Sequence, residues 1–389
     1  MPDIRSRAIL GRTFRANPAY ELVLFDRLEP AVREALADLP QDPDFYGVLR
    51  PRDGAVLSVK SVDRETALLL LTLREPGLLP AYFERVAGVE AERVVARLVA
   101  DSILEIEAAA GFVSGAGAFD LFWEREGAER GGGRLAELSR EALRYGQELD
   151  VQDPLRLSAR LYAYNRRPLT PAWKRVLPDA AAVERHLGIG PGGPHRRLLD
   201  SAWASMGETN GWLSWRSRGK EAGGGGAGAT WKLYVSPEPE ALAGGFGRIL
   251  EALAAARAPQ FKIGKDAPGL LRPDKIVAYF PDFDTLARAA GAISELLSGT
   301  PAQGVPFTAP VAGDGLLSWG IDPPAEERAA WGGRESWRFW LTHRLARALV
   351  AGRSAGEGAP PWRFALERVR LEGVDTDTWT PTARLFRES

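Results

Sequence analysis

The chain has 389 residues, of which 45% are hydrophobic and 26% charged, so it has the composition of a globular protein and the length of two or three domains. Its formal net charge of −1 gives no overall attraction for a nucleic acid, so anion binding has to be local. The absence of cysteine excludes disulfides, thiol catalysis and zinc sites built on thiolates. The three histidines, His186, His195 and His343, have no metal-ligand spacing, and we expect neither a metal nor another cofactor.

The N-terminus lacks the long apolar core of a signal peptide. No uncharged apolar run approaches the roughly 18 residues that a membrane-spanning helix needs. We therefore expect a soluble, cytoplasmic protein with no membrane partner.

Residues 21–115 have the pattern of one small domain, in which helical spacing alternates with short hairpins. The predicted helices are 29–39, 63–75 with Asp63 as N-cap, 78–86 and 90–102. The predicted hairpins are 47–62, joined through Asp53-Gly54, and 103–115, turning at Gly111. Three helices that close on a two-stranded wing make a winged helix, so a winged-helix domain is predicted over residues 1–115.

This segment resembles the PqqD-like domains that bind leader peptides in the biosynthesis of ribosomally made, post-translationally modified peptides. The resemblance covers about a quarter of the chain and rests on pattern rather than on a motif. In such domains the leader adds a strand to a sheet edge, so the resemblance implies a precursor peptide as partner. Two alternatives remain: a winged helix that only packs on its neighbour, and one that binds DNA, which the near-neutral composition disfavours.

The predicted fold class is α+β. Residues 116–198 are predicted to form a helical connecting segment, and residues 199–389 a mixed α+β domain. Closely spaced glycine and proline predict a domain linker at 188–197. The glycine-rich stretch 219–230 lacks the Gly-Lys-Ser/Thr that completes a phosphate-binding loop, and a flexible loop is predicted there.

The last domain alternates strands, helices and an extended proline-rich segment. Strands are predicted at 230–236, 259–265 and 274–280, helices at 240–256, 282–299 and 334–352, and the extended segment at 305–324. The order of the motifs "TWKLYVSP", "PQFKIGK", "DKIVAYF", "VPFTAPVAGDGL" and "ESWRFWLTHRLARAL" resembles the HopA-type effector domain over roughly half of the chain.

That domain occurs in bacterial type III effectors and in lyases of class V lanthipeptide and thioamitide biosynthesis, and its biosynthetic members resemble phosphothreonine lyases. The resemblance therefore implies a HopA-like fold. It also implies elimination of phosphate from phosphoserine or phosphothreonine in a precursor peptide, which leaves a dehydroamino acid. A peptide kinase or another modification enzyme is a further expected partner, whereas a nucleic acid is not.

Such an elimination needs a base for the α-proton and cations for the leaving phosphate. A lysine can be the base if burial or neighbouring cations lower its pKa, and arginine forks or lysine charges hold phosphate. On regular strands Lys262 and Lys265 point to opposite sides, so not every cation of this stretch can serve one site. Lys262 is the candidate base, and the candidate phosphate-binding residues are Lys232, Arg272 and Lys275. The alternative for each strand lysine is a solvated edge position.

The predicted helix 334–352 carries the other candidates. His343 is a candidate general acid, and Arg344 and Trp340 are candidate substrate-binding residues. In the family this helix usually has a His-Arg pair soon after its Glu-Ser start, whereas here Trp340 and Leu341 take those positions and His343-Arg344 follows one turn later. Basic residues near a helix end can also simply complement its dipole. A non-catalytic peptide-binding or scaffold subunit is therefore an alternative function, and a secreted effector-like protein is a third.

Overall fold

The computed structural model describes residues 9–37, 39–53, 57–123, 132–209, 211–218, 230–323, 336–353 and 359–386. The contacts between Cα atoms divide the chain into two compact units. Unit 1 consists of Met1–Ala128 and Ala348–Glu372, and unit 2 consists of Glu129–Arg347 and Gly373–Ser389. Residues 116–198, predicted as one connecting segment, are thus divided between the two units. The glycine-rich stretch 219–230 lies outside the described residues except for Thr230.

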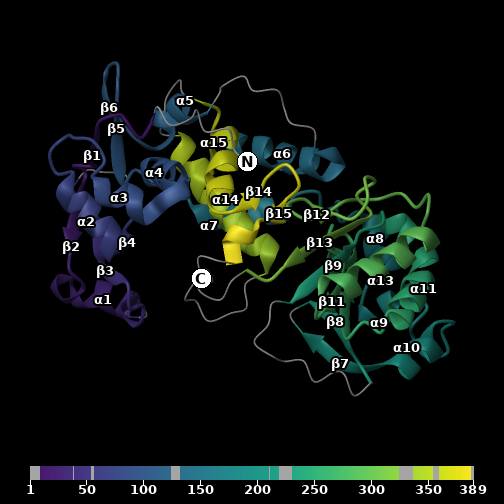
Figure 1. The fold of residues 1–389 in the computed structure, drawn as a ribbon. Helices are drawn as coiled ribbons and strands as arrows, with labels where there is room; N and C mark the ends of the chain where they lie inside the picture. Colours follow the sequence, from purple (N-terminus) through teal and green to yellow (C-terminus); the bar gives the residue numbers. More distant parts are fainter. Residues whose placement is uncertain are drawn as a thin grey trace. The chain divides into compact units, whose positions relative to one another are not determined.

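Unit 1 contains two small antiparallel sheets and a set of helices (Figure 1). One sheet has the order β1-β5-β6 and the other the order β2-β3-β4. The strands are β1 (Phe14–Ala16), β2 (Tyr20–Val23), β3 (Phe45–Pro51), β4 (Lys60–Asp63), β5 (Leu104–Ala108) and β6 (Gly111–Val113). The helices are α1 (Pro30–Ala35), α2 (Arg64–Thr72), α3 (Ala81–Ala87), α4 (Ala91–Ala100), α5 (Phe119–Phe122) and α15 (Pro361–Leu371).

Several local sequence signals of unit 1 are confirmed. The Asp63 side chain caps α2 by accepting a hydrogen bond from the Thr66 amide, and β5 pairs with β6 across a turn that ends at Gly111. Strands β3 and β4 pair as predicted, although their connection lies partly outside the described residues. The fully buried Val95 and Val99 of α4 follow the predicted helical spacing. The PqqD-like identity of this unit stays a prediction.

The helix α15 belongs to unit 1 although it comes from the other end of the chain. Arg368 on α15 forms two hydrogen bonds of 2.7 Å with the Asp101 carboxylate, which follows α4. Arg93 on α4 donates to the backbone carbonyl of Leu371 over 2.7 Å. These charge-assisted bonds at both ends of the contact fix α15 against α4.

Unit 2 is built on a seven-stranded antiparallel sheet with the order β12-β13-β9-β11-β10-β8-β7. Its strands are β7 (Trp203–Thr209), β8 (Trp212–Ser217), β9 (Trp231–Val235), β10 (Gln260–Gly264), β11 (Ile276–Phe280), β12 (Ala309–Pro310) and β13 (Leu317–Ile321), and a separate pair is β14 (Val374–Asp375) with β15 (Thr380–Pro381). Its helices are α6 (Gly133–Glu148), α7 (Pro154–Tyr162), α8 (Pro171–Val176), α9 (Ala180–His186), α10 (Arg196–Ala202), α11 (Pro239–Ala255), α12 (Ala267–Leu270), α13 (Phe283–Leu296) and α14 (Trp337–Gly352), the last turn of which falls in unit 1. The chain is therefore α+β, as predicted.

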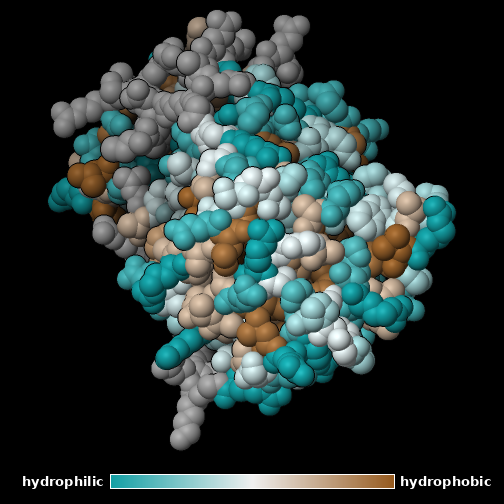
Figure 2. Space-filling model, turned by 90° about the vertical axis from the view of Figure 1, so that its right-hand side faces the viewer, coloured by the Kyte–Doolittle hydropathy of each residue, from teal (hydrophilic) through white to brown (hydrophobic). Residues whose placement is uncertain are grey.

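One face of this sheet forms the main core. The helices α11 and α13 lie along it in Figure 1, and their buried residues, such as Phe246 and Ile293, belong to the same cluster as Phe261 and Ala278 of the sheet. Figure 2 shows hydrophobic residues as small separate areas among hydrophilic ones on the face that it displays, as is ordinary for a protein surface. In the part of the chain that the structure describes, no helix is long and apolar enough to cross a bilayer.

The prediction of a linker at 188–197 is wrong. Ile189 is fully buried in the core of unit 2. The backbone folds back on itself, since the His195 amide donates to the Gly188 carbonyl over 2.9 Å, and Gly188 adopts a φ of 68° that favours glycine. Glycine and proline here make a compact turn that packs inside the unit, and α10 begins directly after it.

Candidate functional site

The second face of the seven-stranded sheet carries polar and aromatic side chains. In antiparallel strands, residues that pair directly point to the same face, and residues two apart along a strand do so too. Lys262 on β10 pairs with Val277 on β11, and Tyr279 on β11 pairs with Lys232 on β9. Trp212 on β8 pairs with Gly264, two residues after Lys262. The register thus brings Lys232, Lys262, Tyr279 and Trp212 to one face, opposite the apolar core.

Lys262 is half-buried, and its amine forms no hydrogen bond or ion pair with any residue that the structure describes. Its Nζ lies 4.4 Å from the centroid of the Trp212 ring and 5.5 Å from that of Tyr279. Burial, and secondarily the nearby charge of Lys232, lower the pKa of Lys262 to about 8. A lysine amine in this state is neutral often enough near neutral pH to accept a proton.

Asp274 and two arginines lie beside this lysine. Arg272 donates from Nε and Nη2 to the two carboxylate oxygens of Asp274, both over 2.8 Å. Arg338, at the start of α14, has its Nη1 2.9 Å from Asp274 Oδ2, and the Tyr162 hydroxyl donates to the same oxygen over 2.9 Å. Burial alone would raise the pKa of Asp274, but the charges of Arg338 and Arg272 hold it below its usual range.

A second buried ion pair lies on the same face. Lys232 and Asp322 are in direct contact and both are buried, and the Lys232 amine lies 5.9 Å from the centroid of Tyr279. Counting the groups named so far, four basic side chains face two carboxylates. The cluster therefore has two excess positive charges when Lys262 is protonated. An anionic ligand would find a net attraction here although the whole chain is nearly neutral.

Three tyrosines complete the cluster, the buried Tyr234 and the half-buried Tyr162 and Tyr279. Burial raises the pKa of Tyr162, Tyr234 and Tyr279, and the nearby carboxylates add to this at Tyr162 and Tyr279. Their hydroxyls stay protonated throughout the physiological range and can donate hydrogen bonds, and that of Tyr162 already donates to Asp274. Among the described residues no group of three or more metal-binding side chains comes together.

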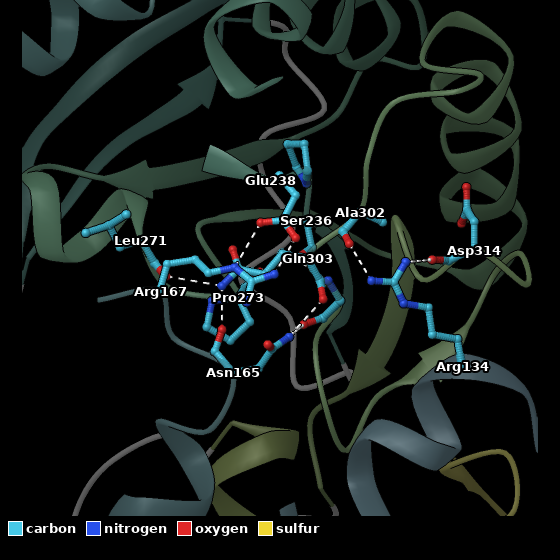
Figure 3. A network of polar contacts seen from close by, with 12 residues as sticks. Arg134, Asn165, Arg167, Ser236, Glu238, Leu271, Pro273, Ala302, Gln303 and Asp314 are labelled. Atoms are coloured by element: carbon cyan, nitrogen blue, oxygen red, sulfur yellow. Dashed lines mark hydrogen bonds and ion pairs between the residues drawn. The ribbon is translucent and has the colours of Figure 1, made fainter. Parts of the chain in front are cut away.

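The turn that carries Arg272 and Asp274 is held from behind by a polar network (Figure 3). The Leu271 carbonyl accepts from the Arg167 amide over 3.0 Å and from Gln303 Nε2 over 3.2 Å. The Pro273 carbonyl accepts from the Ser236 hydroxyl over 2.6 Å. The backbone of the turn is thus anchored at Leu271 and Pro273. The residue after each of these, Arg272 and Asp274, directs its side chain to Tyr162 and Arg338.

Lys275 belongs to this network rather than to the cluster around Lys262. It is fully buried, and its amine donates to the Pro237 carbonyl over 2.7 Å and to the Gln303 side-chain oxygen. Of the three candidate phosphate-binding residues, Lys232 and Arg272 lie in the cluster with Lys262, and Lys275 turns into the interior. Lys265 lies apart, as the strand alternation predicted, and contacts Glu208 over 3.0 Å.

The candidates on α14 face another way. Trp340 is fully buried and stacks on Trp337 with ring centroids 5.3 Å apart, and the Arg344 guanidinium lies 4.0 Å from the Trp340 centroid. His343 stacks on Phe339 at 6.5 Å, and burial followed by the charges of Arg347 and Arg344 lowers its pKa.

The helix residue that reaches the cluster is Arg338. Five residues further along the helix, His343 points about 140° away from it. His343, the candidate general acid, therefore does not point to the face that carries Lys262.

Sequence reasoning missed several members of the cluster, namely Tyr162, Trp212, Asp274, Tyr279, Asp322 and Arg338. Two of them had a local signal. Asp274 follows Arg272 by two residues, and Tyr279 shares the alternation of its strand. The others reach the site through long-range packing, which leaves no mark in a short stretch of sequence.

No protein-family model and no curated protein matches the chain. Among solved structures, the effector protein from Pseudomonas syringae pv. tomato strain DC3000 aligns with a TM-score of 0.41 and 10% identity, over 64% of this chain and 97% of that one. The effector protein from Pseudomonas syringae pv. syringae strain 61 aligns with a TM-score of 0.38 and 13% identity, over 64% and 100%. A structure that is described as giving the structural basis for the catalytic mechanism of phosphothreonine lyase aligns with a TM-score of 0.26 and 11% identity, over 61% of this chain and 99% of that one. Similarities this low carry no argument about activity, which has to come from the site.

Proposed function

We propose that the chain is a lyase that eliminates phosphate from phosphoserine or phosphothreonine in a peptide, with Lys262 as the base. The observation that carries this proposal is the half-buried Lys262 amine, which has no hydrogen-bond or ion-pair partner among the described residues and lies in a cluster with excess positive charge. An amine with a pKa of about 8 is neutral in about one molecule in ten at pH 7. It is thus a stronger base than a carboxylate and is still available near neutrality.

The neighbouring cations supply the second requirement, a site for the leaving group. Arg272 uses Nε and Nη2 for Asp274, so Nη1 keeps its hydrogens for a ligand, and its side chain retains 21% exposure. A phosphate oxygen that accepts from this edge would lie close to Trp212, whose ring centroid is 4.7 Å from the Arg272 guanidinium carbon. Neutral tyrosine hydroxyls, such as that of Tyr279, add donors for the same anion.

The reaction balances without a cofactor. The Lys262 amine takes the α-proton, and the electron pair of the Cα–H bond forms the Cα=Cβ double bond. The Cβ–O bond breaks, and phosphate leaves with the electron pair of that Cβ–O bond. Lys262 ends as an ammonium group and returns its proton to water before the next turnover. Arginine and lysine charges stabilise the phosphate as its charge develops.

The proposal includes a peptide substrate from the biosynthesis of a modified peptide, in which unit 1 holds the leader. Its support is architectural: β4 and β6 of unit 1 each end a sheet, and an extended peptide can add to such an edge. Slower amide hydrogen exchange in β4 or β6 upon addition of the precursor peptide would support this role. Unchanged exchange in both strands at saturating peptide would contradict it.

The elimination is tested with a synthetic library of peptides that carry one phosphoserine or phosphothreonine at a fixed central position. The full-length chain is incubated with the library, and mass spectrometry follows the loss of phosphoric acid. The proposal expects dehydroamino acid products from at least part of the library. A library that keeps its phosphate after prolonged incubation contradicts the activity.

A non-catalytic peptide-binding or scaffold subunit is the second candidate, and the orientation of His343 favours it. With His343 turned away from Arg338, the described cluster contains no group besides Lys262, the proposed base, that titrates near neutral pH. This alternative expects binding of library peptides, seen by fluorescence anisotropy, without any change in their mass. It also expects that Lys262→Met leaves that binding in place.

A further inference from the structure

The Trp212 ring contacts both Lys262 and Arg272, the two cations of the site that have N–H groups available for a ligand. The Trp212 centroid lies 4.4 Å from the Lys262 amine and 4.7 Å from the guanidinium carbon of Arg272. Trp212 begins β8 and pairs with Gly264, which presents no side chain to the shared face. The indole therefore meets no side chain directly across the strand pair and can extend over Lys262.

The two carboxylates near Lys262 are already engaged. Asp274 is held by Arg272 and Arg338, and Asp322 is held by Lys232. Both carboxylates act electrostatically on Lys262, and neither forms an ion pair with it. The contacts that remain to hold the amine are aromatic, with Trp212 nearer than Tyr279.

We propose that Trp212 is a positioning residue, which holds the Lys262 amine and the Arg272 guanidinium at a fixed separation and keeps the amine dry and unpaired. This role of Trp212 deepens the proposed function. The predicted effect on the elimination rate rests on that function, whereas the predicted titration of the Lys262 amine is independent of it. The indole acts in two ways. Its π face attracts both cations, and its bulk excludes water from the amine.

These two actions predict different effects of two substitutions on the titration of Lys262. Trp212→Phe keeps an aromatic face over the amine, so the titration of Lys262 should stay close to that of the wild type. Trp212→Leu removes the face and opens the amine to water, which should move its titration towards that of an ordinary lysine because burial is the main cause of the lowered pKa. Trp212→Met, whose side chain is longer and more flexible and also lacks a ring, is the second variant if the leucine protein does not fold.

The test is the pH dependence of amine acetylation in the full-length chain, read for each lysine by mass spectrometry. The chain has seven lysines, so every site can be followed, and the exposed Lys174 serves as internal reference. Trp215→Phe is the matched control because Trp215 lies on the same strand but faces the core, where it stacks on Phe261 with centroids 5.0 Å apart.

The proposal expects the Lys262 midpoint to rise by at least one pH unit in Trp212→Leu or Trp212→Met, and to stay near that of the wild type in Trp212→Phe and Trp215→Phe. An unchanged midpoint in the folded Leu or Met variant overturns it, and so does an equal shift in Trp215→Phe. With a library peptide that the wild type converts, kcat should fall at least tenfold in Trp212→Leu with a smaller change in KM, and Trp212→Phe should restore most of it. If the wild type converts no peptide, the proposed function fails while the acetylation midpoints still decide the role of Trp212.

Discussion

Arg272 and Asp274 face each other across two hydrogen bonds of 2.8 Å, from a turn in which only one residue separates them. The pair is stabilised on its far side by Arg338, whose Nη1 lies 2.9 Å from the same carboxylate. Because the charge of Asp274 offsets part of the charge of both guanidinium groups, it holds these two cations close together although they would otherwise repel each other. The pair thus prepares a positive surface beside Lys262.

Removing this carboxylate should destabilise unit 2. Asp274 is 2% exposed, and Asp274→Asn leaves the buried Arg338 and the half-buried Arg272 without their counter-charge. Breaking a buried ion pair from one side costs about 3–5 kcal/mol, so the urea midpoint, followed by tryptophan fluorescence, should fall accordingly. The pKa of Asp274 is lowered on folding, so its stabilisation is present above the unfolded value and is lost as the pH falls through the acid range. The variant should therefore differ from the wild type less at pH 3 than at pH 7, and an equal difference at both would contradict this account.

Protonation of Lys275, the buried lysine of the supporting network, should destabilise the folded chain. Burial lowers the pKa of Lys275 to about 7, whereas an unfolded lysine titrates near about 10.4. Between these values the unfolded chain binds a proton that the folded chain does not, so the stability due to Lys275 rises with pH and is lost as the pH falls towards 7.

Lys275→Met removes this dependence. The destabilisation measured relative to the wild type should grow from pH 7 to pH 10, by at most about 1.4 kcal/mol per unit. Lys265→Met, at a partly exposed position of the same hairpin, is the control and should give a stability curve parallel to that of the wild type. Parallel curves for Lys275→Met as well would show that its ammonium costs nothing to bury.

The pH dependence of the elimination should report the Lys262 amine. Since the base has to be neutral, kcat/KM should rise about tenfold per pH unit below pH 8 and level off above it. The measurement is initial-rate kinetics with a converted library peptide between pH 6.5 and 9.5. A rate that is flat across this range, or that falls above pH 7, would assign the base to another group.

Local patterns in the sequence predict much of this fold, because strand alternation and helix caps depend on neighbouring residues. Alternation places Lys262 and Lys265 on opposite sides, and the capping aspartates Asp63 and Asp282 begin their helices as their positions indicate. The residues of each strand that point away from the core can likewise be predicted from the sequence of that strand. These parts follow from one stretch of chain at a time.

The site itself depends on strand order and on distant packing. Strand β11 pairs with β10 on one side and with β9, rather than the next strand along the chain, on the other, and this crossover is what sets Tyr279 beside Lys232. Arg338 and Tyr162 come from different helices and meet through a guanidinium that lies 4.3 Å from the tyrosine ring centroid. No local signal distinguishes Lys275 from Lys262, yet Gln303 and Pro237 draw the Lys275 amine into the interior.

The central claim is that the Lys262 amine removes the α-proton, and a single comparison tests it most directly. The rate of phosphate loss from one converted library peptide is measured by mass spectrometry with the wild type, Lys262→Met and Lys265→Met at pH 8. The account predicts that Lys262→Met is slower by about 10²- to 10⁴-fold, the contribution of a general base, and that Lys265→Met keeps the rate of the wild type. A Lys262→Met protein that binds the peptide and eliminates phosphate as fast as the wild type would contradict the claim.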